Sequence, residues 1–552
     1  MVGLMMNYPL TVSAMLRRAD TFFREKQIVS RRPDRSLQRL SYGELIAHAK
    51  QLALALDHLG VRPGDRVATL AWNHAQHLEA YFAVPTMGAV LHTLNPRLHP
   101  DDLSYIVGDA GDSVLLVDQS LLSLVAQIPS AACLRHVIVM QRTEGLPSNV
   151  LDYDELLASA DLRRHEYYDS AEEDACSMCY TSGTTGRPKG VVYSHRALTL
   201  HSMASAMVDG LAIAEADTIL PAVPMFHVNA WGLPYTATFV GANQVLTGPH
   251  LDPDSLLELL ASERVTLTGG VPTVWLRVLE TLDAEPDRYD LRSLRMILSG
   301  GSAAPPSMIR AFQERHALPV LQAWGMTETT PMGAVGHLLS SERAQPADVR
   351  YEHRAKQGLP MPFVEVRARN VDGLVPWDGE AVGELEVRGP WVARAYVGES
   401  DSDDRFTDDG WFRTGDVVAI AENGRIDLRD RMKDLVKSGG EWISSVALEN
   451  ALMGHPAVAE AAVFAVDHPT WDQRPLAAVV LRSGHRATEQ ELRDYLRPQF
   501  AKWSLPDAVI FVDQIPRTSA GKFQKSALRE RFRDHYANAA GSHNEQRPGA
   551  RT

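Results

Sequence analysis

The chain has 552 residues, 45% of them hydrophobic and 22% charged, which is the composition of an ordinary globular protein with room for several domains. Its net charge is −14, from 69 acidic and 55 basic residues, and no basic block stands out. We therefore expect no nucleic acid partner. No apolar run reaches the length of about 18 residues that a membrane span needs, so we expect no transmembrane segment.

Cysteine usage indicates a reducing compartment. The three cysteines, Cys133, Cys176 and Cys179, cannot form a disulfide framework, so a cytoplasmic location fits. Cys176 and Cys179 are spaced C-x-x-C, but no second pair completes a four-thiolate zinc site. A redox role stays open, and two small core residues on a strand are the favoured interpretation. The start, MVGLMMNYPL, lacks a basic region and a cleavage site, so we interpret it as native chain.

The first part of the chain alternates predicted helices and strands. Residues 41–60 begin with a capping box, Ser41 and Glu44, and end at Gly60, which predicts an amphipathic helix. Helix-length segments separate the short apolar runs RVATLAW, AVLHTLN, SVLLVD and HVIVM. The pattern returns in RVTLTGGVPTVWL and LRMILSGGSAAPP. Such alternation predicts a parallel, doubly wound sheet.

The pattern changes from residue 363. FVEVRAR and GELEVRG alternate with period two, and Asn423 and Gly424 mark the tip of a hairpin in DVVAIAENGRIDLRD. A smaller α+β unit follows. We predict a domain boundary near residue 432, and we expect the polar end of the chain, residues 538–552, to be disordered.

The segment YTSGTTGRPKG, residues 180–190, is too rich in glycine for a helix or a strand interior. Its small residues let a ligand approach the backbone, successive N–H groups can cradle an anion, and Lys189 adds a positive charge. It is not a Walker A loop, because the lysine follows Pro188 and both flanking segments have strand composition. The residues alone leave two interpretations open, a phosphate-binding loop and a flexible hairpin tip.

Five further segments follow in order: PMFHVNAWG (224–232), QAWGMTETTP (322–331), WFRTGD (411–416), DRMKDLVKSGGEWISS (430–445) and IPRTSAGKFQK (515–525). Together with the glycine-rich loop they resemble the adenylate-forming superfamily of acyl-CoA synthetases, nonribosomal-peptide adenylation domains and firefly-type luciferases. The resemblance covers nearly the whole chain. FHVNAW and KSGGEWISS are closest to fatty-acyl-CoA ligases, and similar ligases for short or unusual acids carry WGMTE.

The resemblance implies an α/β fold. A large N-terminal domain of doubly wound sheets plus a small β sub-barrel, residues 1–431, binds ATP and the acid, and a small mobile α+β C-terminal domain, residues 432–537, carries a catalytic lysine. The implied reaction forms an acyl-adenylate and pyrophosphate from a carboxylate and Mg-ATP, and then transfers the acyl group to coenzyme A. Because an anion meets a polyanion, catalysis relies on positioning and charge neutralisation rather than on a protein nucleophile.

The resemblance assigns the glycine-rich loop to the β- and γ-phosphates of ATP. The residues concerned are Thr181, Ser182, Gly183, Thr184, Thr185, Gly186 and Lys189, of which Thr184 also counts as catalytic. Glu328 matches the Mg²⁺ ligand, since a hard carboxylate with phosphate oxygens and water suits this ion. Thr327 matches a phosphate contact.

The nucleoside is assigned to a second group of residues. Asp416 is expected to accept both ribose hydroxyls, and Arg431 matches a second ribose or phosphate contact. Backbone is expected against adenine at small residues, with an aromatic ring beside it; these are Gly301, Ala303, Ala304, Trp324 and Gly325. Trp324 stands where the family usually has tyrosine, so any hydrogen bond from the tyrosine hydroxyl is expected to be lost.

Lys522 in SAGKFQK matches the catalytic lysine that reaches the carboxylate and the α-phosphate. Lys433 matches the hinge about which the C-terminal domain rotates between the two half-reactions. The coenzyme A channel is then expected to be lined by Lys437, Gly439, Gly440 and Glu441.

The acid is assigned to the FHVNAW side of the site, at His227, Val228, Trp231, Gly300 and Trp324. His227 is expected near the acyl carboxylate, with a catalytic role, and Trp231 is expected to gate an acyl tunnel. Core packing stays open for both. The segment GLPYTATFVGA suits a tunnel wall and equally an ordinary buried helix, and His195 and His201 receive no role.

We therefore predict an AMP-forming acyl-CoA ligase for a medium- or long-chain fatty acid or another largely apolar carboxylic acid, with ATP, Mg²⁺ and coenzyme A as cofactors. A bulky natural-product acid remains open, as does an acyl-AMP ligase that loads a carrier protein. A nucleotide-binding protein without turnover is the rival from another class, and the intact Glu328, Asp416 and Lys522 argue against it. The sequence does not give the oligomeric state, and a homodimer is one assembly that it allows.

Overall fold

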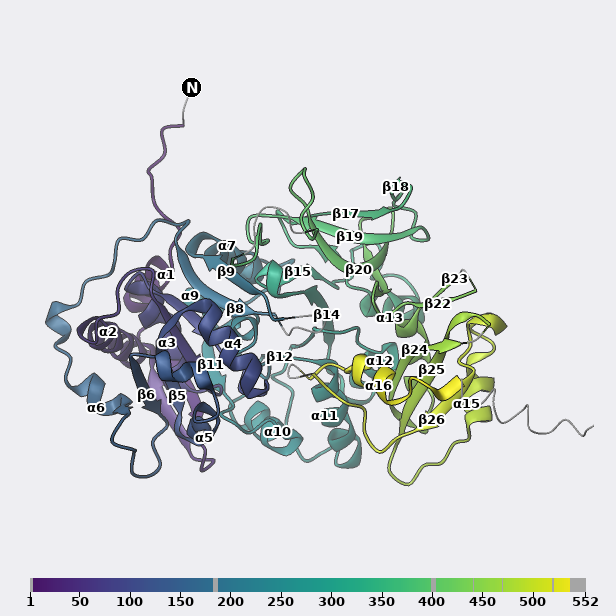
Figure 1. Ribbon diagram of the computed structural model, residues 1–552, viewed down its shortest axis with the longest axis horizontal. Coiled ribbons are helices and arrows are strands. Elements are labelled where there is room, and N and C mark those ends of the chain that lie inside the picture. The colour runs from purple at the N-terminus through teal and green to yellow at the C-terminus, as the bar shows by residue number, and fades with distance from the viewer. Residues whose placement is uncertain are drawn as a thin grey trace, which may run out of the picture.

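The computed structural model describes residues 3–181, 187–398, 404–439, 441–468, 470–518 and 521–536. The expected disordered tail, 538–552, lies outside these ranges. Figure 1 shows the chain passing from its N-terminal helices and strands through a β-rich region (green) to its C-terminal residues (yellow) at the other end of the molecule. Among the described helices, none has the length and apolar content that a membrane span requires.

A seven-stranded sheet contains the first predicted strands. Its order is β7 (Leu151–Asp152), β6 (His136–Met140), β5 (Asp112–Asp118), β3 (Arg66–Leu70), β4 (Val90–Thr93), β8 (Ala175–Tyr180) and β9 (Gly190–Ser194). All neighbours are parallel except β8 and β9. Val67 packs in one hydrophobic core and the next residue, Ala68, in another. Helices α2 (Tyr42–His58), α3 (Ala75–Thr86) and α6 (Tyr153–Ala158) contribute to the first core, and α4 (Pro100–Ala110) and α5 (Leu122–Val125) to the second. Because successive residues of one strand enter different cores, helices cover both faces of this sheet, as predicted.

A nine-stranded sheet holds the later alternating segments. Its order is β16 (Leu359–Pro360), β15 (Met332–Val335), β14 (Val320–Gly325), β13 (Met296–Ser299), β12 (Leu267–Gly270), β10 (Thr218–Pro221), β11 (Asn243–Leu246), β1 (Gln27–Arg31) and β2 (Leu37–Ser41). The strands from β14 to β1 are parallel, and the edge strands β2, β15 and β16 are antiparallel.

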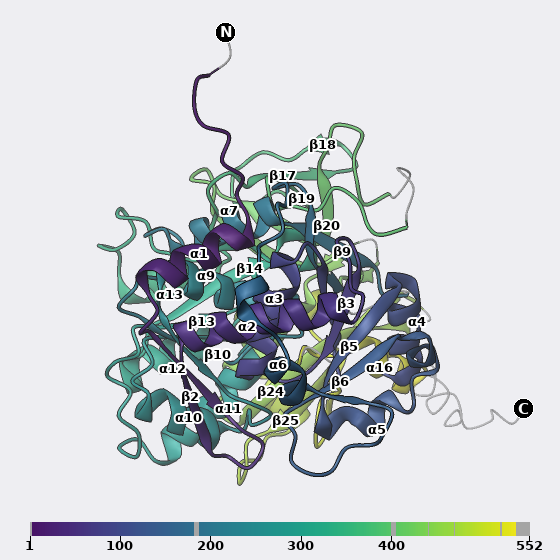
Figure 2. The ribbon, with the colours of Figure 1, turned by 90° about the vertical axis from the view of Figure 1, so that its left-hand side faces the viewer.

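Helices also pack on this second sheet. One core contains residues of α10 (Pro253–Ser262), α11 (Pro272–Ala284) and α12 (Pro306–His316), with α13 (Ala347–Ala355) against it. The largest core contains residues of α1 (Val12–Phe22), α7 (His195–Ala206) and α9 (Leu233–Val240) together with α2 and α3. Figure 2 shows α1, α2 and α3 on the face of the molecule turned toward the viewer. Both parallel sheets therefore share one helical layer.

The capping box of α2 is confirmed: Glu44 N donates to Ser41 Oγ at 3.2 Å, and Ser41 N donates to Glu44 Oε2 at 2.7 Å. The predicted β subdomain is a five-stranded antiparallel sheet in the order β18 (Gly373–Leu374), β17 (Glu365–Asn370), β19 (Val382–Arg388), β20 (Phe412–Ile420) and β21 (Ile426–Arg431). Its last hairpin turns at Asn423 and Gly424, and Gly424 takes the positive φ of 83° that favours glycine there.

The C-terminal residues form a smaller unit around a separate sheet. Its strands are β22 (Val436–Ser438), β23 (Glu441–Ile443), β24 (Val458–His468), β25 (Asp472–Leu481) and β26 (Ala508–Phe511). Helices α14 (Ser445–Met453), α15 (Glu489–Leu496) and α16 (Lys525–Arg531) pack on it around two hydrophobic cores. The exact boundary near residue 432 stays a prediction.

A buried polar cluster joins the end of β21 to this unit. Lys525 Nζ lies 2.7 Å from Glu449 Oε1 and donates to Ser445 Oγ at 2.7 Å. Ser445 Oγ in turn donates to Asp430 Oδ2 at 2.7 Å. Burial raises the pKa of both carboxyl groups. Lys525 is therefore the cation for two buried carboxyl groups, those of Glu449 and Asp430.

We expect Lys525→Ala to lower the free energy of unfolding by about 3–5 kcal/mol, because it leaves Glu449 and Asp430 buried without their cation. Lys437→Ala, at an exposed position of β22, is the matched control and should change stability by less than about 0.5 kcal/mol. Chemical denaturation measures both. A loss for Lys525→Ala no larger than that of the control would show that water solvates the cluster.

Candidate active site

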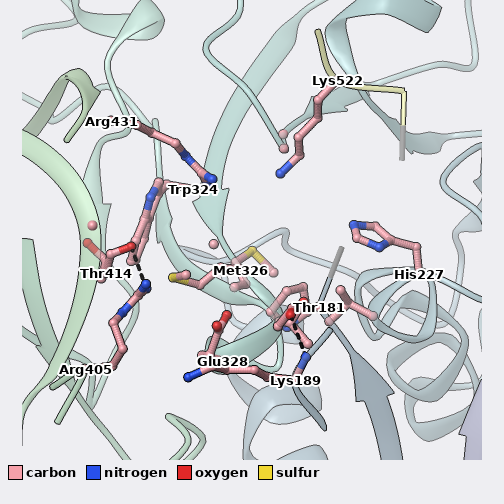
Figure 3. Close-up of a pocket in the computed structure, with 18 of the residues that line it drawn as sticks. Thr181, Lys189, His227, Trp324, Met326, Glu328, Arg405, Thr414, Arg431 and Lys522 are labelled. Atoms are coloured by element: carbon pink, nitrogen blue, oxygen red, sulfur yellow. Dashed lines mark hydrogen bonds between the residues drawn. The ribbon is translucent and has the colours of Figure 1, made fainter. Parts of the chain in front are cut away.

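A cavity of about 570 Å³ lies between the N-terminal sheets and the C-terminal unit, within the size range of ordinary ligand pockets. It opens beyond the carboxyl ends of β13 and β14, where open α/β sheets bind ligands. The lining includes these predicted site residues: Thr181, Lys189, His227, Val228, Trp231, Gly300, Gly301, Trp324, Gly325, Thr327, Glu328, Arg431, Lys433 and Lys522. Segments far apart in the sequence thus meet at one site, as Figure 3 shows.

Other predicted site residues do not line this cavity. Asp416 is buried and accepts a hydrogen bond from Trp324, and Ala304 is buried with its N–H donated to Gln322 Oε1 at 2.9 Å. Ala303, Lys437, Gly439 and Glu441 also lie off the cavity wall; the last three belong to or border the hairpin of β22 and β23. The predicted phosphate ligands Ser182, Gly183, Thr184, Thr185 and Gly186, and the predicted channel residue Gly440, lie outside the described residues.

The base of the glycine-rich loop joins two antiparallel strands, β8 and β9, as its flanks predicted. Thr181 N donates to Lys189 O at 2.9 Å, and Lys189 N donates to Thr181 Oγ1 at 3.1 Å. The Lys189 ammonium lies 4.7 Å from the centre of the Tyr396 ring. The Lys189 ammonium therefore places a positive charge at this end of the cavity, next to the hydrogen-bonded base of the loop. This arrangement suits an anionic ligand.

Glu328 lies in a 3-10 turn, Thr327–Thr329, directly after β14. Its carboxylate is 5% exposed and accepts a hydrogen bond of 2.5 Å from the Tyr396 hydroxyl. The described residues contain no group of three or more His, Cys, Asp or Glu side chains that could hold a metal ion. A Mg²⁺ ion held by Glu328 would thus take its other ligands from phosphate oxygens and water, which fits the usual coordination of this ion at nucleotides.

The nucleoside end adds a contact of Trp324 that the sequence did not predict. Although the hydroxyl of a tyrosine is absent, the indole provides a donor of its own: Nε1 donates to Asp416 Oδ2 at 2.8 Å. Arg431 Nε lies 3.1 Å from Asp416 Oδ1, and this carboxylate raises the pKa of Arg431. The buried carboxylate therefore accepts a hydrogen bond on Oδ2 and forms an ion pair through Oδ1, which has no hydrogen-bond partner among the described residues.

Lys522 and His227 face each other across the opposite side of the cavity (Figure 3). Burial, reinforced by the charge of Arg431, lowers the pKa of Lys522 to about 8. Burial also lowers the pKa of His227 to about 3, and the charges of Lys522 and Arg97 act in the same direction. At neutral pH the cationic Lys522 thus faces a neutral imidazole. His227 can therefore donate or accept a hydrogen bond with a ligand but adds no charge.

The cavity-wall residues that sequence reasoning missed include Tyr396 and Arg405, which lie between the motifs in a segment without a clear pattern. Arg405 Nε donates to Arg413 O at 2.8 Å, and its Nη2 donates to Thr414 O at 3.1 Å. It therefore braces the strand that carries Asp416. The local sequence contains no pattern that predicts this contact.

The FHVNAW segment adopts an unusual backbone. Val228, Asn229, Ala230 and Trp231 have φ values of 46°, 51°, 49° and 58°, and Gly232 follows at 71°. A left-handed turn costs roughly 1–2 kcal/mol for each residue that carries a Cβ. Asn229, 1% exposed, anchors the turn: its Nδ2 donates to Ser177 Oγ at 2.8 Å, and Cys179 Sγ donates to its Oδ1 at 3.5 Å.

This turn presents His227 and Trp231 to the cavity. The Trp231 ring lies against Gly300, whose ideal Cβ would come 3.2 Å from the ring. Helix α9, which carries the segment that suited a tunnel wall, contributes no residue to the cavity lining, and most of it is buried. The ordinary buried helix is therefore the interpretation that fits this segment.

The histidines without an assigned role are structural. His195 Nδ1 accepts a hydrogen bond from Val12 N at 3.2 Å, and His201 Nε2 accepts one from Met332 N at 3.3 Å. Burial lowers the pKa of both to about 4, so both are neutral. Cys176 and Cys179 are buried on β8, as expected for core residues.

Comparisons with known proteins agree with this geometry. Residues 17–397 match the family described as AMP-binding enzyme, and residues 447–522 match the AMP-binding enzyme C-terminal domain. A long-chain-fatty-acid–CoA ligase of Thermus thermophilus is 51% identical over 540 residues, 97% of this chain and 98% of that protein. A 3-methylmercaptopropionyl-CoA ligase of Ruegeria lacuscaerulensis is 42% identical over 544 residues, 97% and 99% of the two chains.

A solved structure shares the fold. The anthranilate CoA ligase AuaEII in complex with anthranoyl-AMP superimposes with a TM-score of 0.84 at 25% identity, covering 97% of this chain and 99% of that one. The likeness thus extends over both the N-terminal sheets and the C-terminal unit.

We expect Asn229→Ala to lower the free energy of unfolding by about 1–3 kcal/mol, because it removes two buried hydrogen bonds and a residue that tolerates the left-handed region. Ser177→Ala removes one of these hydrogen bonds together with the one that Ser177 Oγ donates to Leu91 O at 3.2 Å, so it breaks the same number without changing the turn and is the matched control. Thermal and chemical denaturation measure both losses. Equal losses would show that the left-handed backbone places no demand on residue 229.

Proposed function

Because the chain belongs to the AMP-binding enzyme family, we propose that it is an AMP-forming acyl-CoA ligase that joins a carboxylic acid to AMP and then transfers the acyl group to coenzyme A. The observation that carries the proposal is the convergence of Lys522, Arg431 and Glu328 on one cavity. Joining a carboxylate to ATP needs cations and a metal ligand rather than a nucleophile.

In the first half-reaction, the Lys522 ammonium neutralises charge between the carboxylate and the α-phosphate. Thr181, Lys189 and the loop between them, which includes Thr184, hold the β- and γ-phosphates. Glu328 and the phosphate oxygens would hold Mg²⁺, which spreads the phosphate charge when bound. Asp416 accepts the ribose hydroxyls, and neutral His227 orients the carboxylate.

In the second half-reaction, the C-terminal unit rotates about Lys433 and carries the hairpin of Lys437, Gly439, Gly440 and Glu441 toward the acyl-adenylate. Two features support this step. The hairpin lies off the cavity while Lys522 lines it, so the present orientation suits adenylation. Lys433 lies in the short connection between β21 and β22 with its side chain exposed, and its carbonyl oxygen accepts a hydrogen bond from Arg529 Nη1 at 3.2 Å that a change of φ and ψ would exchange.

The acid is a medium- or long-chain fatty acid or another largely apolar carboxylic acid. Apolar side chains line its side of the cavity, namely Val228, Trp231, Leu298, Met326 and Met332. The two relatives support an apolar acid without fixing its length, since one is named for long-chain fatty acids and the other for a short thioether acid.

Two further properties belong to this proposal. The enzyme is cytoplasmic, which is supported by three cysteines that are all free. It forms a homodimer, for which the exposed N-terminal residues Leu4, Met5 and Met6 offer apolar surface. Light scattering during size-exclusion chromatography tests the assembly, and a monomer mass would contradict it.

The test of the function uses the purified enzyme with ATP, Mg²⁺, coenzyme A and a graded series of acids. We expect pyrophosphate, AMP and acyl-CoA in equal amounts. Lys522→Ala should slow pyrophosphate release by about 10²–10³ and spare thioester formation from supplied acyl-adenylate. Lys502→Ala, exposed in the same unit, is the control.

Pyrophosphate release without acyl-CoA would indicate a carrier protein as acceptor, and binding of ATP with no turnover would overturn the proposal. If Lys522→Ala slowed both half-reactions equally, the proposal that Lys522 acts in adenylation and not in thioester formation would be wrong.

The lowered pKa of Lys522 sets a pH dependence. The ammonium is present below about pH 8 and is lost above it, so kcat/KM for pyrophosphate release should fall as the pH rises through about 8. Lys522→Arg keeps its charge and should move this fall to higher pH. An unshifted profile in the arginine variant would show that another group causes it.

Trp231→Ala separates a gate from a core residue. If Trp231 gates the acyl side, the variant should favour long or bulky acids, and short acids should lose about 0.8 kcal/mol for each CH₂ no longer buried. If it is only core, stability should fall by about 3–5 kcal/mol with the acyl preference unchanged. The melting temperature and kcat/KM over a graded acid series distinguish the two, and the second outcome contradicts the gate.

A further inference from the structure

Trp324 and Asp416 connect two separate sheets behind the nucleotide side of the cavity. Trp324 belongs to β14 of the nine-stranded sheet, and Asp416 belongs to β20 of the antiparallel sheet. Their hydrogen bond of 2.8 Å is buried, since the two residues are only 7% and 2% exposed. Arg431, the register partner of Asp416 on β21, holds the other carboxylate oxygen at 3.1 Å.

The indole reaches Asp416 because of a glycine on the neighbouring strand. Gly333 of β15 lies against the ring, and an ideal Cβ at this position would come 2.3 Å from Cζ3 and 2.7 Å from Cε3 of Trp324. No side chain can occupy that space while the ring stays in place. Gly333 and Trp324 thus form a matched pair that fixes the direction of the N–H group.

We propose that Trp324 is a positioning residue for Asp416 and thereby sets the selectivity of the site for ribose over deoxyribose. The inference rests on the proposed function, in which Asp416 accepts the ribose hydroxyls. An ionised carboxylate has about four acceptor positions. The indole occupies one on Oδ2, and Arg431 forms an ion pair with Oδ1, which has no hydrogen-bond partner among the described residues, so acceptor positions remain for the 2′- and 3′-hydroxyls.

The physical basis is orientation. The terminal torsion of an aspartate is broad, so an unheld carboxylate samples many rotations about its last bond. With the indole N–H on Oδ2 and the guanidinium on Oδ1, the plane of the carboxylate is fixed before the nucleotide arrives. A group held in its productive direction binds without the cost of ordering it.

The test measures kcat/KM for pyrophosphate release with ATP, 2′-deoxyATP and 3′-deoxyATP. Trp324→Phe keeps an aromatic ring and removes the donor, and it should reduce the preference for ATP over each deoxynucleotide about tenfold. The ratio cancels any change in stacking on the base, which all three nucleotides share. A merely structural role for Trp324 would change all three values alike.

Gly333→Ala is the second variant, because it retains every polar group and displaces the ring. It should lose the same preference, and melting temperatures confirm that each variant is folded. Asp416→Asn separates the role of Asp416 in ribose binding from the positioning role of Trp324. If Asp416→Asn retains the preference, the ribose role in the proposed function is wrong. If Asp416→Asn loses it while Trp324→Phe and Gly333→Ala retain it, the positioning inference is overturned and the proposed function stands.

Discussion

The position of Lys522 in the cavity is supported by a contact between the C-terminal loop that carries this residue and the beginning of α11. Thr273 Oγ1 donates to Gly521 O at 3.1 Å, and Lys522 follows directly. Its side chain passes so close to Gly301 that an ideal Cβ there would lie 3.4 Å from Cε. This contact helps to hold the Lys522 ammonium in the cavity that Glu328 also lines, so the two opposite charges of an adenylating site share one cavity.

Other described contacts between the two parts of the chain include polar ones. Ser307 Oγ donates to Met453 O at 3.3 Å, and Arg482 lies 3.4 Å from Glu280. Such contacts contribute about 1 kcal/mol or less each, so breaking these two costs little. Asp430 and Ser445 lie on opposite sides of Lys433 along the chain, and a rotation about Lys433 must break their buried hydrogen bond together with the one that Ser444 Oγ donates to Arg429 O.

The sequence predicted the features that depend on neighbouring residues or on a motif. The capping box at Ser41, the hairpin at Asn423, the strands beside the glycine-rich loop and the meeting of the motifs at one cavity are of this kind. It did not predict the left-handed turn at Asn229, because only burial against Ser177 and Cys179 offsets the strain. It also missed the donor of Trp324 and the brace of Arg405, because both depend on strands that become neighbours only in the folded chain.

The fit of Trp324 against Gly333 also constrains how this site can evolve. With the indole in place, a methyl group at residue 333 meets ring carbons well inside contact distance. If residue 324 first becomes a smaller ring, that space opens and residue 333 is released. The two positions are therefore epistatic: a lineage that leaves tryptophan can later lose the glycine, whereas one that loses the glycine first passes through a clash. The packing therefore constrains the order of the two substitutions as well as the final pair of residues.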